Sequence, residues 1–204
     1  MKRLNRERWE DKINKMKIGI DIDGVMTDMY NAIIDTATEF CYSNNIDYKI
    51  DNSKYNENEM FNISEDDAER YWNRYLAEYA VKCPPRRFTQ EVIEKLKKDN
   101  EIYIITARDE EGLPEELHGT MQEMVKKWLK ENNIEYDKLI FTKEKLKICR
   151  ENNIDIMIED SPKNIEEIHK EIKVLCFDAP YNRKVAGENI TRVYSWYDIL
   201  RKLD

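Results

Sequence analysis

Two carboxylates lie at the end of the first apolar run of the chain, residues 18–22. Asp21 and Asp23 are two residues apart, and Gly24 follows them. Alternate residues of an extended segment point to the same side, and a glycine turn lets the backbone bend so that both carboxylates approach one ligand. This spacing favours a pair of acids that act together.

Other strand-like runs also end in side chains that can do chemistry. They are Thr106, either Lys143 or Lys145, and the adjacent acids Glu159 and Asp160. In an open parallel sheet, the carboxyl ends of the strands line a shared crevice in which ligands bind. We therefore expect these side chains to meet Asp21 and Asp23 there.

The three aspartates Asp21, Asp23 and Asp160 provide oxygen donors of the kind that Mg²⁺ prefers, together with waters and a substrate phosphate. A carboxylate beside Mg²⁺ can attack phosphorus and form an aspartyl-phosphate, while a second carboxylate protonates the leaving alcohol and then activates water. Hydroxyl and ammonium groups can hold the phosphoryl oxygens, whose charge must be stabilised in the transition state. The predicted chemistry is magnesium-dependent phosphoryl transfer.

Scarce residue types exclude other kinds of site. The only histidines, His118 and His169, lie far apart, which removes the common zinc hydrolase patterns and argues against a Ser-His or Cys-His triad. The five glycines form no Gly-x-Gly-x-x-Gly loop, and the P-loop spacing of Gly19 and Gly24 lacks the lysine and hydroxyl residue that must follow. Neither common nucleotide-binding glycine loop is therefore present.

Charge and composition exclude polyanionic partners. Acidic residues number 42 and basic residues 34, a net charge of −8, so the chain carries no electrostatic footprint for nucleic-acid polymers or anionic membranes. No stretch approaches the ~18 apolar residues of a membrane span, and no apolar signal region follows the charged start. The cysteines occur singly, at Cys41, Cys83, Cys149 and Cys176. They are typical of reduced thiols in a cytoplasmic protein.

The elements that must position these groups alternate between strands and helices. Apolar runs predict strands at 18–22, 101–106, 138–142, 155–160 and 174–178, and helical periodicity predicts helices at 90–99, 120–132, 143–152 and 163–171. This order favours an α/β fold with a parallel sheet covered on both faces. Residues 1–16 are predicted to form a leading helix that packs through Leu4, Trp9 and Ile13, without a function.

The segment 25–87 breaks this alternation. Helical patterns at about 28–44 and 64–80 flank a polar loop, which predicts an inserted helical cap over one end of the sheet. The core then comprises residues 1–24 and 88–204. An aromatic stripe runs along the second helix at helical spacing: Tyr71, Trp72, Tyr75 and Tyr79. Most of these rings are expected to pack inside the cap.

Four segments, in this order, resemble the motifs of the haloacid dehalogenase-like (HAD) phosphohydrolases. They are Asp21-Ile22-Asp23-Gly24-Val25, Thr106 within Ile104-Ile105-Thr106-Ala107-Arg108, a lysine near residue 145, and Glu159-Asp160 after Ile156-Met157-Ile158. The resemblance covers residues 17–200. The cap position, the Ile-Thr-Ala-Arg segment and the late Pro180-Tyr181-Asn182 are similar to the 5′(3′)-deoxyribonucleotidase family and related bacterial nucleotidases. The resemblance implies a Rossmann-like HAD core, a central parallel sheet flanked by helices, with a small helical cap inserted after the first strand.

The resemblance also implies roles for the acids. Asp21 is expected to be the nucleophile and a ligand of Mg²⁺, and Asp23 the general acid/base that binds the metal through its carbonyl. Asp160 would be the third protein ligand, with Glu159 in the outer shell. Many members have Asp where this chain has Glu159, which leaves open which of the two adjacent acids touches the metal. The presence of Asp23 favours a phosphatase, because the dehalogenases and phosphonatases of this fold lack the second acid.

The remaining matched residues would hold the substrate. Thr106 and a lysine are expected to bind the phosphate, with Lys145 preferred over Lys143 and then Lys147. Arg108 is either a structural ion-pair partner or a phosphate contact, and is counted among the substrate-binding candidates.

The chain is accordingly predicted to be a phosphatase of small phosphomonoesters, most specifically a nucleotidase acting on nucleoside or deoxynucleoside monophosphates. Trp72 is the expected stacking face for the base, with Tyr75 and Tyr71 as alternatives. The alternatives are a general phosphatase of sugar phosphates or similar compounds, and a non-catalytic HAD-like binding protein. The last would be marked by loss of Asp21 or Asp23, and both are present.

Overall fold

The computed structural model describes residues 15–203 and contains a six-stranded parallel sheet with the strand order β3-β2-β1-β4-β5-β6. The strands are β1 (Met16–Ile20), β2 (Asn100–Thr106), β3 (Lys138–Phe141), β4 (Ile156–Glu159), β5 (Lys173–Phe177) and β6 (Ile190–Val193). Every neighbouring pair is parallel. The carboxyl ends of the central strands β1, β2 and β4 therefore share one edge, as the sequence predicted.

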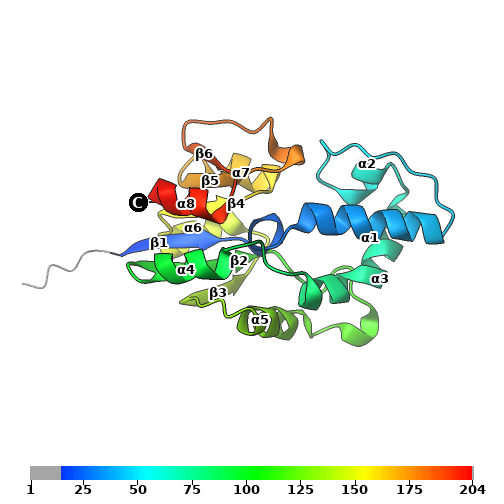
Figure 1. Ribbon diagram of the computed structural model, residues 1–204, viewed down its shortest axis with the longest axis horizontal. Coiled ribbons are helices and arrows are strands. Elements are labelled where there is room, and N and C mark those ends of the chain that lie inside the picture. Colours follow the sequence, from blue (N-terminus) through cyan, green and yellow to red (C-terminus); the bar gives the residue numbers. More distant parts are fainter. Residues whose placement is uncertain (1–14, 204) are drawn as a thin grey trace, which may run out of the picture.

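Helices cover both faces of the sheet (Figure 1). Alternate strand residues supply the two faces: Ile102 and Ile104 join one buried cluster, whereas Tyr103 and Ile105 join another. The first cluster includes side chains of α4 (Thr89–Lys97), α5 (Met121–Glu131) and α8 (Trp196–Leu203), and the second includes side chains of α6 (Lys145–Asn152) and α7 (Pro162–Ile168). The expected α/β fold is confirmed.

Three helices lie between β1 and α4, on the side of the sheet where β1 leads out (Figure 1). They are α1 (Met29–Ser43), α2 (Glu57–Phe61) and α3 (Glu65–Lys82). We call residues 28–84 the helical insertion. Its buried cluster is built on residues such as Phe40, Phe61 and Tyr71, and it also takes in Tyr181 of the core. Val25 and Met26 pack with the sheet core instead.

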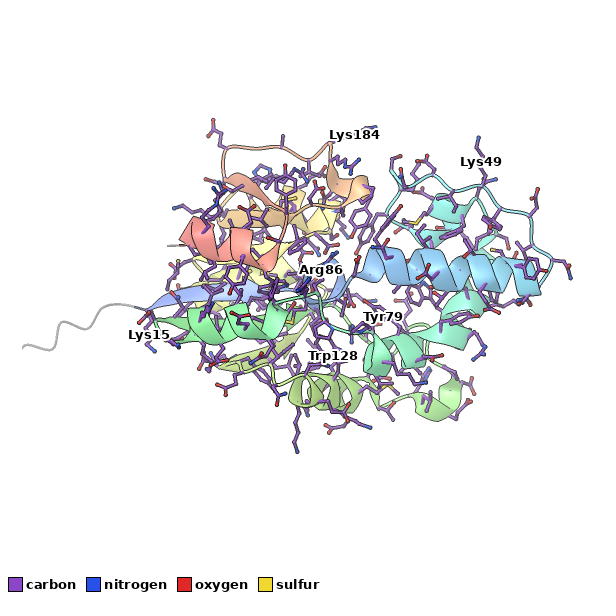
Figure 2. All side chains as sticks on the ribbon, viewed as in Figure 1. Lys15, Lys49, Tyr79, Arg86, Trp128 and Lys184 are labelled. Atoms are coloured by element: carbon purple, nitrogen blue, oxygen red, sulfur yellow. The ribbon has the colours of Figure 1, made fainter. Side chains whose placement is uncertain are left out.

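The two connections to the helical insertion run side by side. An antiparallel bridge joins Thr27 to Pro85. Arg86 crosses this junction, because its Nε donates to the Thr27 carbonyl at 3.1 Å and its Nη2 to the Gly24 carbonyl at 3.1 Å. Its guanidinium also lies 4.7 Å from the centre of the Phe177 ring. Figure 2 shows Arg86 and Tyr79 at the junction of sheet and insertion.

The predicted elements agree with the structure to within a few residues at their ends, and the sequence analysis missed only short elements: α2, β6 and α8, besides helical turns at 22–26, 115–117 and 180–182. The elements α2, β6 and α8 have five, four and eight residues, lengths at which the periodic pattern is weak. The helix predicted over residues 1–16, with Leu4, Trp9 and Ile13, falls outside the described residues except at its end, where Met16 instead begins β1. Within residues 15–203, no helix has the length and apolar character that crossing a membrane requires.

Candidate active site

Asp21 lies immediately after β1, where the strand gives way to a tight turn over Ile22–Met26. Its backbone N–H still donates to the Ile158 carbonyl of β4 at 3.1 Å, so the sheet fixes its position. Gly24 has φ of 77°, and a Cβ there would overlap the Asp160 carboxylate. Glycine therefore serves two purposes at this position: it permits the left-handed turn and leaves room for Asp160, which follows β4.

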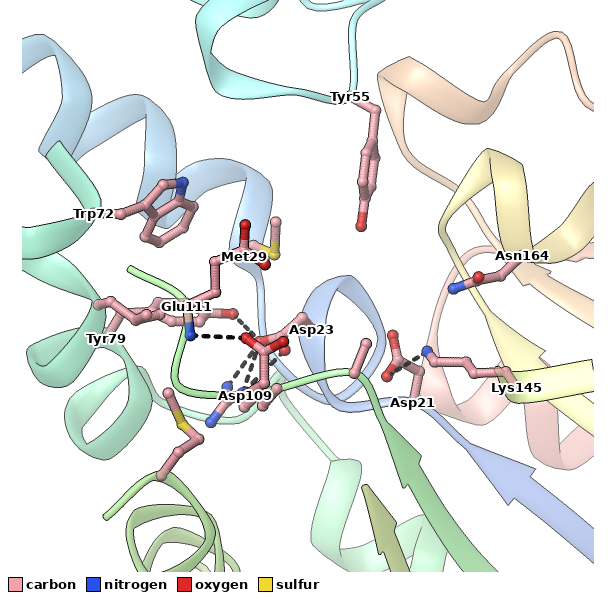
Figure 3. A pocket seen from close by; sticks show the side chains of 14 residues that line it. Asp21, Asp23, Met29, Tyr55, Trp72, Tyr79, Asp109, Glu111, Lys145 and Asn164 are labelled. Atoms are coloured by element: carbon pink, nitrogen blue, oxygen red, sulfur yellow. Dashed lines mark hydrogen bonds and ion pairs between the residues drawn. The ribbon is translucent and has the colours of Figure 1, made fainter. Parts of the chain in front are cut away.

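Three buried carboxylates meet at this edge of the sheet. Asp21, Glu159 and Asp160 each offer an oxygen within 4.8 Å of the others. Lys145, the first residue of α6, lies among them with its Nζ 2.8 Å from Asp21 Oδ1 and 2.7 Å from Glu159 Oε2. Figure 3 shows the Lys145 ammonium directed at Asp21. Lys145 thus pairs with two of the three acids, Asp21 and Glu159, and not with Asp160.

Glu159 and Asp160 differ in what their oxygens already bind. The Glu159 carboxylate accepts hydrogen bonds from Lys145, from the backbone N–H groups of Asp160 and Ser161, and from Asn164. In Asp160, Oδ2 accepts from Tyr181, whereas Oδ1 is buried without a hydrogen-bond partner among the described residues. Asp160 therefore has an oxygen available for a ligand, and Glu159 has none to spare.

The pKa values of Asp21 and Asp160 reflect the excess of acidic groups in this cluster. Burial, reinforced by the charge of Glu159 and opposed by Lys145, raises the pKa of Asp21 from 3.8 to about 8. Burial and the charges of Glu159 and Asp21 also raise the pKa of Asp160 well above its ordinary value. Lys145 therefore does not offset the effect of burial and of the neighbouring acids on these two carboxyls.

Asp23 has the opposite environment. Arg108 donates to it through Nε (2.9 Å to Oδ2) and Nη2 (2.7 Å to Oδ1), and the Tyr79 hydroxyl donates at 2.6 Å to Oδ1. Burial works against ionisation of Asp23, but the charge of Arg108 and the hydrogen bonds from both donors outweigh it and lower the pKa of this carboxyl. Arg108 is thus committed to Asp23, and its Nη1 donates to the Ala80 carbonyl.

The other predicted phosphate-binding residues lie in different places. Thr106 ends β2 and is fully buried, and its Oγ1 accepts from the Arg108 backbone N–H at 3.2 Å, which leaves the hydroxyl hydrogen to donate elsewhere. Lys143 is exposed and pairs with acids of the β2–α5 connection, and Lys147 is exposed and pairs with Glu144. Of the three candidate lysines, Lys145 is the one beside Asp21.

A cavity of about 200 Å³ opens between the charged groups at the strand ends and the helical insertion. Its lining includes Asp21, Asp23, Arg108 and Lys145 from the core, and Trp72, Leu76 and Tyr79 from α3. Figure 3 shows Trp72 and Tyr79 on one side of the cavity and Lys145 on the other. Tyr71 and Tyr75 do not line it; they pack against Phe40 inside the insertion.

Several residues of the site carried no clear sequence signal. Tyr55 extends into the cavity from the insertion (Figure 3) and packs edge-on against Tyr181, with ring centres 5.1 Å apart. It lies in a loop that has no periodic pattern. Tyr181 was visible only as part of a late motif, and Tyr79 only as part of the aromatic stripe. Asn164, in the first turn of α7, lies four residues after Asp160, and that spacing could have indicated it.

Comparisons with known proteins agree with this arrangement. The model of the family described as "5′ nucleotidase, deoxy (Pyrimidine), cytosolic type C protein" matches residues 14–203. A nucleotidase of Clostridium acetobutylicum is 29% identical over 195 residues, which cover 94% of this chain and 95% of that protein.

Solved structures show the same fold. A haloacid dehalogenase-like family hydrolase from Streptococcus pneumoniae superposes with a TM-score of 0.66 at 14% identity, covering 93% of this chain and 99% of that one. CbbY from Rhodobacter sphaeroides, solved with phosphate, superposes with a TM-score of 0.56 at 12% identity, covering 87% and 92%. The family match leads to one conclusion, and the fold agrees with it: the chain belongs to the 5′ nucleotidase, deoxy (pyrimidine), cytosolic type C family and is a phosphatase.

Proposed function

We propose that this phosphatase is a magnesium-dependent nucleotidase that hydrolyses nucleoside or deoxynucleoside monophosphates through an aspartyl-phosphate on Asp21. The observation that carries the proposal is the buried cluster of Asp21, Glu159 and Asp160 around the single ammonium of Lys145. A buried excess of negative charge is costly unless a cation compensates it. The cluster is therefore suited to a divalent cation and the phosphate that accompanies it.

The donors fit Mg²⁺. They are all oxygens, the cluster contains no histidine or cysteine, and Asp160 Oδ1 is a buried acceptor that lacks a partner among the described residues. We assign the carboxylates of Asp21 and Asp160 and the carbonyl of Asp23 as ligands, with Glu159 behind them. When bound, Mg²⁺ would screen the negative charge that the phosphoryl group and Asp21 bring together.

The residues of the chain then divide the reaction. The Asp21 carboxylate attacks phosphorus, and Asp23, which must enter this step protonated although Arg108 and Tyr79 lower its pKa, delivers that proton to the leaving oxygen as the phosphorus–oxygen bond to the alcohol breaks. Asp23, now a carboxylate, takes a proton from water as that water attacks the phosphoryl group on Asp21. Lys145 and the Thr106 hydroxyl hold phosphoryl oxygens, whose charge they stabilise in the transition state.

We further propose that the helical insertion acts as a cap that selects the substrate and shields the phosphoaspartate from water. Trp72 of α3 lines the cavity and supports this assignment, because its indole offers an apolar face across the cavity from Lys145. Base stacking on such a face contributes roughly 1–3 kcal/mol per base.

The direct test is release of phosphate from a panel of phosphomonoesters in the presence of Mg²⁺. We expect nucleoside and deoxynucleoside monophosphates to have the highest kcat/KM in the panel. Equal or higher values for sugar phosphates would replace the nucleotidase assignment with a general small-molecule phosphatase. No release from any ester by the folded protein with Mg²⁺ would contradict the catalytic assignment.

A further inference from the structure

The donors around Asp23 come from two parts of the molecule. Arg108 follows β2 and therefore belongs to the core, whereas Tyr79 belongs to α3 of the helical insertion. The two donors also contact each other, because the Arg108 guanidinium lies 5.2 Å from the centre of the Tyr79 ring. Arg108 is further tied to α3 by its bond to the Ala80 carbonyl at 3.3 Å. The surroundings of Asp23 therefore depend on where α3 is seated.

Tyr79 is fixed from a second direction as well. Its oxygen lies 2.8 Å from Thr27 Oγ1, and the Thr27 hydroxyl in turn lies 3.3 Å from the Ile22 carbonyl. Thr27 is fully buried and takes part in the bridge to Pro85. The hydroxyl of Tyr79 thus joins the connection into the insertion, the end of α3 and the carboxylate of Asp23.

The two oxygens of Asp23 are unequally occupied. Oδ1 accepts from both Tyr79 (2.6 Å) and Arg108 Nη2 (2.7 Å), whereas Oδ2 has its shortest bond to Arg108 Nε at 2.9 Å. Donors on both oxygens fix the plane of the carboxylate, and Oδ2, which accepts one hydrogen bond where Oδ1 accepts two short ones, is the oxygen better able to exchange a proton with a substrate or water.

We propose that Tyr79 and Arg108 are positioning residues: they orient the Asp23 carboxylate for proton transfer, and Tyr79 makes this orientation depend on the seating of the helical insertion. The inference rests on the function proposed above, because it concerns the acid that protonates the leaving alcohol. Neither residue contacts phosphorus in this role. Arg108, counted from the sequence among the substrate-binding candidates, acts here through Asp23.

Two substrates with different leaving groups distinguish this positioning role from a purely structural one. A nucleoside leaves as an alkoxide unless it is protonated, whereas p-nitrophenolate is a stable anion that leaves with little help from an acid. The ratio kcat/KM reports only the steps up to cleavage of the phosphorus–oxygen bond to the alcohol, so slow hydrolysis of the phosphoaspartate does not mask the effect.

Tyr79→Phe is the decisive variant, and Tyr75→Phe is its matched control. Tyr75 lies one turn earlier on the same helix, and its hydroxyl donates to a different carboxylate, Glu39, outside the cavity. For Tyr79→Phe we expect kcat/KM for a nucleoside monophosphate to fall by roughly 10-fold to 100-fold, the range for a hydrogen bond to a charged group. The value for p-nitrophenyl phosphate should change by about threefold or less. Tyr75→Phe should leave both values near those of the wild type.

Arg108→Lys extends the test, because lysine keeps the charge but does not make the two-pronged contact. The same selective loss, larger than in Tyr79→Phe, is expected. An equal loss on the two esters in folded Tyr79→Phe protein would overturn the positioning role while leaving the proposed function intact. Failure of the wild type to hydrolyse either ester would overturn the proposed function, and this assignment with it.

Discussion

Asp21 and Asp23 lie two residues apart, yet the fold gives them opposite surroundings. Asp21 belongs to a group of three buried acids, two of which pair with Lys145, and its pKa is raised to about 8. Asp23 has Arg108 to itself, and its pKa is lowered because that guanidinium and Tyr79 overcome the effect of burial. The first region is short of positive charge and the second is balanced.

The difference shows how one turn can supply two kinds of acid. The core alone builds the Asp21 region, from residues that follow β1 and β4 and from the start of α6. The Asp23 region needs the helical insertion as well, through Tyr79. We infer that binding of a cation completes the first region and that seating of the insertion completes the second.

The largest expected effect is on turnover. Asp21→Asn should lower kcat by on the order of 10⁴-fold or more, because an amide is a poor nucleophile and a poor metal ligand. The fold should persist, since Lys145 keeps Glu159 as its partner; because the change also removes a carboxyl whose ionisation burial opposes, the metal-free variant should be at least as stable as the wild type. Phosphate release together with circular dichroism checks both statements. Activity retained by the folded variant would remove the mechanism proposed for Asp21.

Removal of the metal should have a similar effect on turnover. EDTA should stop phosphate release and Mg²⁺ should restore it, with Zn²⁺ a poor substitute because the cluster offers oxygen ligands alone. Mg²⁺ should also raise the melting temperature of the metal-free wild type. Full activity after exhaustive chelation would show that the charge imbalance around Asp21 has another purpose.

Replacement of Asp23 by asparagine should lower the stability of the protein. Asp23→Asn leaves the buried Arg108 without its carboxylate partner, and loss of one member of a buried ion pair costs about 3 kcal/mol. Urea unfolding of the metal-free proteins measures this cost. The comparison between the two regions fails if Asp21→Asn destabilises the metal-free protein as much as Asp23→Asn does.

The stability of the metal-free protein should depend on pH. The pKa of Asp21 is raised from 3.8 to about 8, so the folded protein holds a proton that the unfolded chain has released between these values. The contribution is fully present below about pH 4 and is lost as the pH rises towards 8. Asp23, with its lowered pKa, contributes in the opposite sense, above its ordinary pKa, and loses that contribution only in acid. Unfolding free energies measured from pH 5 to pH 8 without metal should therefore decline, and the decline should be smaller in Asp21→Asn.

The smallest effect is expected on the insertion side of the cavity. Trp72→Ala should raise KM for nucleoside monophosphates about tenfold, in line with the loss of one stacking contact, with little change for p-nitrophenyl phosphate. Kinetics of the folded variant on both esters measure the selectivity. If both substrates lose equally, Trp72 is a packing residue, and it stabilises the insertion rather than binding the base.

The sequence predicts the Asp21 region better than the Asp23 region. Asp21, Lys145 and Asp160 stand at the ends of strands or at the start of a helix, positions that apolar periodicity locates. Tyr79 is one of four aromatic residues at helical spacing, and which ring reaches the site depends on how α3 packs on the core. No periodicity within α3 contains that information.

Tyr55 illustrates a second limit. It reaches the acidic cluster from the loop between α1 and α2, and burial together with the charges of Asp160 and Glu159 raises the pKa of its hydroxyl well above the ordinary value. Loop residues carry no repeating pattern, so their contacts arise only when two distant segments fold together. The parallel sheet, by contrast, follows from the alternation of strands and helices.

The antiparallel bridge between Thr27 and Pro85 makes the two ends of the helical insertion neighbours. A segment whose ends meet can take the place of a short loop without altering the order of the strands on either side. Residues 28–84 therefore form a natural cassette, and the six-stranded sheet can accept a different one at the same junction. Protein engineers could exchange the wall that faces the substrate, provided that the replacement keeps a hydroxyl at the place of Tyr79 to orient Asp23.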